Sequence, residues 1–409
     1  MFHVTPSLDI VARYCSVPRL GTVDVAAPDW PLDLELSPAT MRIISTMKAV
    51  RMGHIRRAKL AMALLLLASI GLEERRCSCA VVQFIFGDSL SDVGNNNYLT
   101  RSLARPALPW YGIDFGNGLP SGRFTNGRTI ADIVGDTVGL PRPPAFLDPS
   151  LDDETILNKG VNYASGGGGI LNQTASFFIQ RYSLWKQIEL FKGTQDMIRL
   201  KIGNEAADKF FKQARYVVAM GSNDYINNFL VPIYPDSWNY NGETFTNYLI
   251  TTLESQLTVL HSLGVRQMTL FGLGPLGCIP LQRFLDLSGQ CQESTNKLAL
   301  MFNSKSKNLL ENLSRTLPNV TFKFGDAYSF FQKIIDHPET YGFTNSSAPC
   351  CSTGNIRPAI TCTPLSNLCK DRSKYVFWDE YHPTDKTNEL IANSFVKALG
   401  FGKPIKGTN

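Results

Sequence analysis

The chain has 409 residues, of which 44% are hydrophobic and 18% are charged, and its formal net charge is +5. These proportions are those of a globular protein with enough apolar residues for a large core. This net charge is small for the length and does not indicate a surface that binds nucleic acid. The sequence also contains no basic stripe, P-loop or metal-ligand cluster. We therefore expect no nucleic-acid partner, no cofactor and no metal.

The N-terminal part of the chain does not have the pattern of a folded domain. Residues 1–46 contain several prolines and no clear hydrophobic periodicity, and we interpret them as an unstructured upstream extension. Residues 47–79 contain a basic stretch and then an apolar run, which is typical of a secretory signal peptide and too short to span a bilayer. We expect translation to start at Met47 or Met52 and the mature chain to lack a transmembrane span. The alternative is a membrane-anchored or internal apolar helix.

The first predicted strand covers residues 81–86, an apolar run rich in β-branched and aromatic residues that stops at Gly87. Such a run predicts a strand buried in a parallel sheet, and the glycine marks the turn that leaves its carboxyl end. Ligands bind at that end of the strands in open α/β sheets, so Ser89 is a candidate site residue. The alternative is that Ser89 only caps a helix.

Further elements follow in the middle of the chain. Residues 95–127 are rich in Asn, Gly and Pro and predict a long loop, a kind of segment that is often functional. A helix is predicted at 129–138. A short apolar strand then ends in the four glycines 166–169, which would let the backbone approach a ligand closely. The next predicted helix has a core-facing set of apolar residues, Leu184, Ile188 and Phe191.

The pattern of a strand followed by glycine returns at residues 215–224, where the side-chain amide of Asn223 could donate a hydrogen bond to developing negative charge. The alternative is an Asx-turn at the end of a strand. Strands separated by helices predict a parallel sheet covered on both faces, within one domain from 80 to 402 and followed by a tail at 403–409. The remaining predicted elements are helices at 245–263 and 293–317 and strands at 266–271 and 320–324.

Asp379 and His382 lie three residues apart near the C-terminus. Serine is a poor nucleophile until a base accepts its proton, and imidazole has a suitable pKa for that task. A carboxylate can orient the imidazole and stabilise its cationic form. The pair therefore predicts the base and the orienting acid of a catalytic triad. The alternative is an acid at a helix N-terminus beside an incidental surface histidine.

The cysteines and glycosylation sequons predict an oxidising compartment. Six of the nine cysteines form an even set in the C-terminal third, without the spacing of a zinc site, and we expect disulfides. Cys278 and Cys291 flank one loop and are the preferred pair. The connectivity of the other four, Cys350, Cys351, Cys362 and Cys369, stays open. Four sequons also predict secretion, at Asn172, Asn312, Asn319 and Asn345.

Six stretches together resemble the plant GDSL esterase/lipase branch of the SGNH hydrolase family. The most specific is FGDSLSDVGNNNYL at 86–99, and the strings PWYGIDF and SGRFTNG in the following loop also look like this branch. The glycine run, the Asn223 segment and the segment from Asp379 to His382 resemble later blocks of the family. The resemblance covers about residues 80–402 and implies a three-layer α/β/α, flavodoxin-like fold with a mainly parallel five-stranded sheet.

The resemblance also implies the roles of individual residues. Ser89 would be the nucleophile, His382 the base and then the acid, and Asp379 the residue that orients it. The oxyanion would be received by the N–H groups of Ser89 and Gly167 and by the side chain of Asn223. Gly167 is chosen by alignment, and the run of four glycines leaves its register open.

These observations predict a secreted serine esterase or lipase, located in the apoplast or cell wall, that hydrolyses carboxylic esters through an acyl-serine intermediate. Its partner would be a small-molecule or lipid ester. The alternatives are an acyltransferase or carbohydrate-ester deacetylase with the same triad, or a secreted binding protein with little turnover. Acyl chain length and oligomeric state cannot be read from the sequence.

Overall fold

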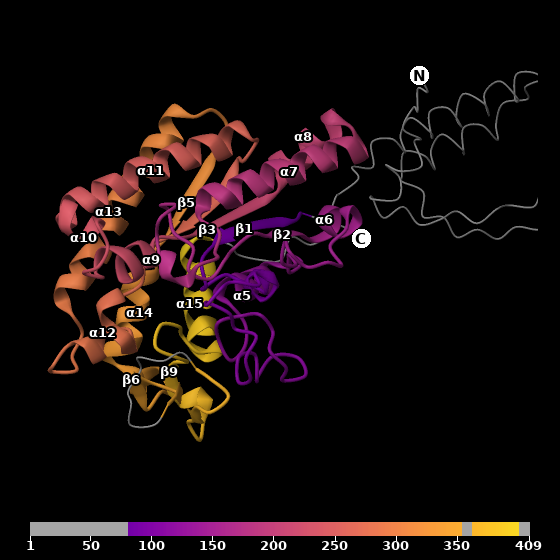
Figure 1. Cartoon of the computed structure of the whole chain (residues 1–409). Coiled ribbons are helices and arrows are strands. Elements are labelled where there is room, and N and C mark those ends of the chain that lie inside the picture. Colours follow the sequence, from indigo (N-terminus) through magenta and orange to yellow (C-terminus); the bar gives the residue numbers. More distant parts are fainter. Residues whose placement is uncertain (1–80, 354–361, 401–409) are drawn as a thin grey trace, which may run out of the picture. The chain divides into compact units, whose positions relative to one another are not determined.

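The computed structural model describes residues 81–353 and 362–400. The extension at 1–46, the signal-peptide region at 47–79 and the tail at 403–409 lie outside the described residues, as do both expected ends of the domain. The described part is built on a five-stranded sheet in the order β2-β1-β3-β4-β5, in which every neighbouring pair is parallel (Figure 1). The strands are β1 (Gln83–Gly87), β2 (Gly160–Asn162), β3 (Arg215–Ala219), β4 (Gln267–Phe271) and β5 (Thr321–Gly325).

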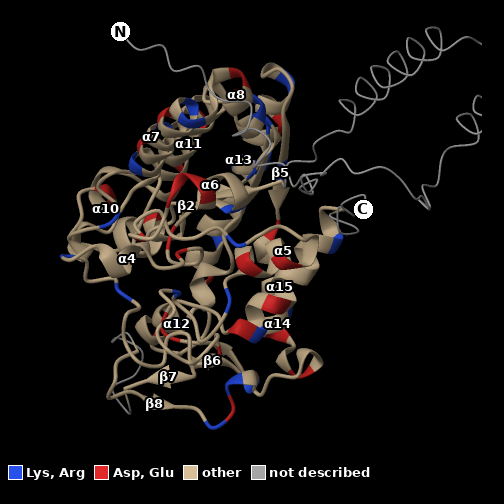
Figure 2. Cartoon of the chain, turned by 90° about the vertical axis from the view of Figure 1, so that its right-hand side faces the viewer, with Lys and Arg blue, Asp and Glu red and all other residues tan. Residues whose placement is uncertain are grey.

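The sheet has the predicted doubly wound form, with helices on both faces (Figure 1). One face packs α7, α8, α11 and α13 against one another, and the other carries α5, α14 and α15. Figure 2 shows that charges of both signs lie mainly on these outer helices and on the connecting loops. The bounds are α5 (Ile130–Val138), α6 (Asp153–Lys159), α7 (Leu184–Ile202), α8 (Asn204–Gln213), α11 (Gly242–Ser262), α13 (Glu293–Thr316), α14 (Ala327–Asp336) and α15 (Asp385–Ala398).

Strand β1 lies inside the sheet, paired with β2 on one side and with β3 on the other, and all five of its residues are buried. Its Phe84 ring stacks on Tyr216 of β3 with ring centroids 5.5 Å apart. The chain leaves β1 towards β2 on one side and later reaches β3 on the other. This reversal creates a crevice at the carboxyl end of β1, which is where open α/β sheets bind ligands.

Helix boundaries follow from capping residues that the periodicity alone does not reveal. The helix expected to begin at 245 begins at Gly242, because Asn241 and Thr244 form a capping box there. Helix α5 begins after Thr129, whose side chain accepts the Asp132 N–H while the Asp132 carboxylate accepts the Thr129 N–H. The long loop at 95–127 is largely irregular, as predicted, apart from the short helix α4 (Asn95–Tyr98).

The shorter elements surround the carboxyl edge of the sheet and the C-terminal part of the chain. The helical segments are α9 (Ser222–Asp224), α10 (Asp236–Asn239), α12 (Pro280–Leu285), the 3₁₀ turns Ser176–Phe178, Leu276–Cys278, Pro338–Tyr341 and Arg372–Lys374, and the π-helical segment Tyr225–Phe229. The short strands are β6 (Asn345–Pro349), β7 (Cys351–Ser352), β8 (Asn367–Leu368) and β9 (Tyr375–Phe377).

Three disulfides are present in the described residues. Cys278–Cys291 is the predicted pair, and the other four cysteines form Cys350–Cys369 and Cys351–Cys362. The last two bridges pack against the buried Trp378, and the Cys351 N–H donates to the Trp378 carbonyl. They therefore brace the backbone that precedes His382. None of the helices in residues 81–353 and 362–400 is both long enough and apolar enough to cross a membrane.

Candidate active site

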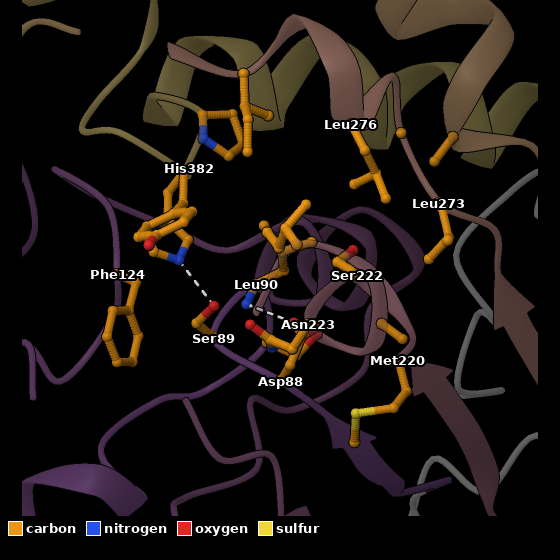
Figure 3. A pocket seen from close by; sticks show the side chains of 18 of the residues that line it. Asp88, Ser89, Leu90, Phe124, Met220, Ser222, Asn223, Leu273, Leu276 and His382 are labelled. Carbon is orange, nitrogen blue, oxygen red and sulfur yellow. Dashed lines mark hydrogen bonds between the residues drawn. The ribbon is translucent and has the colours of Figure 1, made fainter. Parts of the chain in front are cut away.

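Ser89 lies two residues after the end of β1 and faces a cavity at the carboxyl edge of the sheet (Figure 3). A glycine is required at the end of β1, since a Cβ on Gly87 would lie 2.9 Å from the Ala219 carbonyl oxygen of the neighbouring strand. The N–H groups of Ser91 and Asp92 both donate to the Asp88 carbonyl, which closes a tight turn around Ser89. The turn leaves the serine hydroxyl partly exposed at the mouth of the crevice.

Asp379 and His382 come from a turn that follows β9. The N–H groups of Tyr381 and His382 donate to Oδ1 of Asp379, and the Trp378 N–H donates to the His382 carbonyl. The three-residue spacing therefore closes a compact turn that holds both side chains. His382 Nδ1 is 2.8 Å from both carboxylate oxygens, and Nε2 is 2.8 Å from Ser89 Oγ. The structure thus joins the three predicted triad residues in series.

Burial and charge set the protonation of this pair. Burial acts to raise the pKa of Asp379, but the His382 charge and the hydrogen bonds to the carboxylate together outweigh it, and the pKa lies below its ordinary value. Burial acts to lower the pKa of His382, but the charge and hydrogen bond of Asp379, with the charges of Glu380 and Asp88, raise it above the ordinary histidine value. With Asp379 ionised, the hydrogen bond favours a proton on Nδ1 and leaves the Nε2 lone pair facing Ser89.

Tyr111 is a further contact of the triad that the sequence analysis missed. Its hydroxyl donates to Oδ2 of Asp379 at 2.7 Å, and both side chains are fully buried. The Phe124 ring from the same loop lies 5.2 Å from the His382 ring, centroid to centroid. The available signal was the string PWYGIDF, which places three aromatic residues in a loop rich in Asn, Gly and Pro. The long loop therefore packs against the Asp–His turn.

Among the four glycines of the run, Gly167 lines the cavity. The N–H groups of its two neighbours are occupied: Gly166 donates to Asp92 Oδ2, and Gly168 donates to the Ser165 carbonyl. Within the described part of the chain, neither the Gly167 N–H nor the Ser89 N–H has a hydrogen-bond acceptor. Both are therefore available to a ligand at the mouth of the crevice.

The amide of Asn223 lines the same cavity and is held in one orientation. Its Nδ2 donates to the Gly168 carbonyl at 2.9 Å, and its Oδ1 accepts from Asn227 Nδ2 at 2.6 Å. No other acceptor for Nδ2 lies among residues 81–353 and 362–400, so one of its two N–H groups remains for a ligand. This bonding fixes which end of the amide faces the cavity.

Two buried carboxylates, also missed from the sequence, hold the glycine run at its two ends. Asp92 accepts the Gly166 N–H together with three N–H groups of its own loop. Asp224 accepts the N–H groups of Ile170 and Leu171 and the hydroxyl of Thr174. Burial raises the pKa of each to about 6, against the opposing effect of these donors. The signal that could have revealed them was their place in the sequence, since Asp92 lies three residues after Ser89 and Asp224 directly follows Asn223.

The rest of the cavity is mainly apolar. Figure 3 shows Phe124 and His382 on one side of Ser89, and Met220, Leu273 and Leu276 on the other. Asp88 lies in the wall beside Ser89, where burial raises its pKa to about 7 despite the hydrogen bond from the Leu90 N–H. Further apolar residues lining it are Leu90, Ile130, Phe178, Ile226, Phe271, Ile279, Phe331, Ile391 and Phe395.

The four sequon asparagines lie outside this cavity. Asn172, Asn312 and Asn319 are exposed, whereas Asn345 is half-buried and its side chain accepts two backbone N–H groups.

An open parallel α/β sheet with serine, histidine and aspartate joined at its carboxyl edge is the arrangement typical of serine hydrolases. Comparison with known proteins agrees with this class. The profile of the GDSL-like lipase/acylhydrolase family matches residues 84–395. A GDSL esterase/lipase of Arabidopsis thaliana is 65% identical over 329 residues, which are 80% of this chain and 90% of the relative.

Two further Arabidopsis thaliana relatives carry the same name. One GDSL esterase/lipase is 43% identical and covers 83% of this chain and 95% of its own length. GDSL esterase/lipase 7 is 42% identical and covers 79% of this chain and 89% of its own length. The chain therefore belongs to the GDSL-like lipase/acylhydrolase family and is a carboxylic ester hydrolase.

Proposed function

We propose that the protein is a secreted esterase or lipase that cleaves acyl esters through an acyl-serine intermediate on Ser89. The observation that carries the proposal is the series of contacts from Asp379 through His382 to Ser89, each 2.8 Å long. His382 Nε2 takes the Ser89 proton as Oγ attacks the ester carbonyl, and then returns it to the leaving alcohol. Water attacks the acyl-serine in the second half, with His382 again as the base.

The oxyanion of the tetrahedral intermediate would be received by three donors. The Ser89 N–H and the Gly167 N–H are without acceptors in the described residues, and Asn223 has one N–H remaining. Donors held in place before the reaction stabilise developing charge without reorganising. Asp92 and Asp224 contribute by holding the ends of the glycine run, and so act on the position of Gly167.

The cavity walls support an apolar acyl group as the part of the substrate that binds beside Ser89. Met220, Leu273 and Leu276 offer apolar contacts on the side opposite to His382 (Figure 3). Burying a methylene contributes about 0.8 kcal/mol, so such walls favour a hydrocarbon chain over a hydrated one. The proposed reaction takes place without a cofactor, because the chain itself supplies the nucleophile, the base and the oxyanion donors.

Secretion is supported by the three disulfides and by the exposure of three of the four sequon asparagines. We propose that residues 47–79 act as the signal region, that the domain runs from 80 to 402 with a tail at 403–409, and that the mature enzyme lies in the apoplast or cell wall. Glycans would be carried by Asn172, Asn312, Asn319 and Asn345.

The test is labelling of the secreted protein with a fluorophosphonate, followed by mass spectrometry of the peptides. Wild-type enzyme should carry one phosphonyl group on Ser89 and lose ester hydrolysis in proportion to labelling. Ser89→Ala should be unlabelled and inactive while keeping the wild-type melting temperature. A label on another residue, or hydrolysis by Ser89→Ala within tenfold of wild type, would remove the proposed mechanism.

A further inference from the structure

Three large apolar side chains stand exposed beside the mouth of the cavity. Leu103 is 67% exposed, Phe177 is 41% exposed and Ile179 is 54% exposed. Two segments bring them together: Ser102 and Ile179 form an antiparallel bridge, and the Leu103 N–H donates to the Phe178 carbonyl at 3.1 Å. These three residues, here named the apolar lip, therefore form one surface. Contiguous exposed apolar surface in a soluble enzyme marks a place of contact with something else.

The apolar lip is continuous with the active-site cavity. Leu103 and Phe178 both line the cavity, whereas the residues on either side of Phe178 point outward. The Phe178 ring covers Gly167, because a Cβ added to that glycine would lie 2.8 Å from Phe178 Cδ2. One tripeptide thus supplies a wall beside the proposed oxyanion donor and two side chains of the exposed surface.

The backbone of the apolar lip is held in an unfavourable conformation. Ile179 has φ 66° and ψ −67°, and the Gln180 N–H donates to the Phe178 carbonyl at 2.8 Å across it. This is a classic γ-turn, a rare and strained form, and a β-branched residue tolerates it poorly. Burial of the side chain does not offset the strain, since most of it is exposed. Strain of this kind collects at functional sites.

The two chain segments that carry the apolar lip are positively charged. Residues 95–113 and 166–185, which include both segments, contain three arginines and no Asp or Glu. Arg105 and Arg181 donate to backbone carbonyls, which leave their charge uncompensated, and Arg101 is exposed beside Gln180. Apolar side chains flanked by cations are the combination that binds a lipid–water interface bearing anionic groups.

We propose that the apolar lip docks the enzyme on the surface of aggregated lipid carrying anionic groups, so that an ester passes from that surface into the cavity. Phe177 and Ile179 insert into the apolar layer, and the arginines lie at its charged boundary. The inference rests on the proposed function only in that the lipid surface supplies the ester.

The experiment compares wild type with Phe177→Ser/Ile179→Asn, since neither residue lines the cavity and asparagine accepts a positive φ. Leu200→Ser is the matched control: this leucine is 90% exposed near the end of α7, which runs back from the carboxyl edge of the sheet. Flotation would use vesicles of phosphatidylcholine and phosphatidylglycerol at 3:1, and vesicles of phosphatidylcholine alone. Hydrolysis would be measured on soluble 4-nitrophenyl butyrate and on 4-nitrophenyl palmitate dispersed in the anionic vesicles.

Wild type and Leu200→Ser should bind the anionic vesicles at least threefold more tightly than the neutral ones. The double variant should lose at least tenfold in anionic-vesicle binding and in hydrolysis of the dispersed ester, with kcat/KM on the soluble ester within twofold of wild type. Vesicle binding by the double variant equal to wild type, or equal wild-type binding to both vesicles, would overturn the proposal. A concentration-dependent dimer that wild type and Leu200→Ser form and the double variant does not form would also overturn the proposal. The apolar lip would then contact a second copy of the chain. Fluorophosphonate labelling of Ser89 in solution is unaffected by any of these outcomes, so the proposed function stands or fails separately.

Discussion

Removing the Tyr111 hydroxyl should lower the stability of the fold and raise the pKa of His382. Its hydrogen bond ends on an ionised carboxylate, and both residues are fully buried. A bond to a charged group contributes about 1.5–3 kcal/mol, whereas one between neutral groups contributes about 0.5–1.5 kcal/mol. Tyr111→Phe should therefore reduce the free energy of unfolding at neutral pH by about 1.5–3 kcal/mol. The matched control is Tyr163→Phe, which removes an equally buried hydroxyl that donates to the neutral hydroxyl of Thr194. This variant should reduce the free energy of unfolding by about 0.5–1.5 kcal/mol.

The sign of the pH effects follows from the lowered pKa of Asp379. The Tyr111 bond helps to lower that pKa, so its contribution to stability is fully present above the unfolded aspartate pKa and is lost as the pH falls through the folded one. Without the bond, the carboxylate holds the His382 proton more strongly, and the acid limb of kcat/KM moves to higher pH.

The assay is urea unfolding at neutral pH together with the pH profile of kcat/KM on a soluble ester, for Tyr111→Phe and Tyr163→Phe in parallel. Equal loss of unfolding free energy in the two variants, with the acid limb of Tyr111→Phe unmoved, would show that the hydroxyl does not act on Asp379.

Three other predictions concern the same site and its export. In wild type, kcat/KM should fall on the acid side with an apparent pKa above the ordinary histidine value, because His382 must be neutral to act and Asp379, Glu380 and Asp88 raise its pKa; a profile flat from pH 5 to 8 would exclude it as the base. Asn223→Ala should lower kcat by roughly 10²- to 10³-fold with much less change in KM, whereas a lower melting temperature with kcat preserved would make it a structural residue. The mature secreted protein should begin near residue 80 and contain no free thiol, and mass spectrometry finding residues 1–46 would contradict this.

Features set by local chemistry could be predicted from the sequence. The alternation of buried strands and amphipathic helices predicted the sheet, since each run of side chains has to bury its own apolar face. The Asp379–His382 pair could be found because its turn closes within a few residues, through N–H groups that donate to the same carboxylate. Cys278 and Cys291 are similarly close in the chain and were paired correctly.

Only the tertiary structure decided the contacts between distant segments. Tyr111 and Asp379 are 268 residues apart, and no periodicity relates a loop tyrosine to a carboxylate that far along the chain. The register of the glycine run depends on Asp92, Asp224 and Phe178, which occupy or cover the positions around Gly167. The strained γ-turn at Ile179 lies where its segment pairs with the distant Ser102. In each case the packing of the loops on the sheet determines which residues meet. A local sequence pattern does not predict that packing.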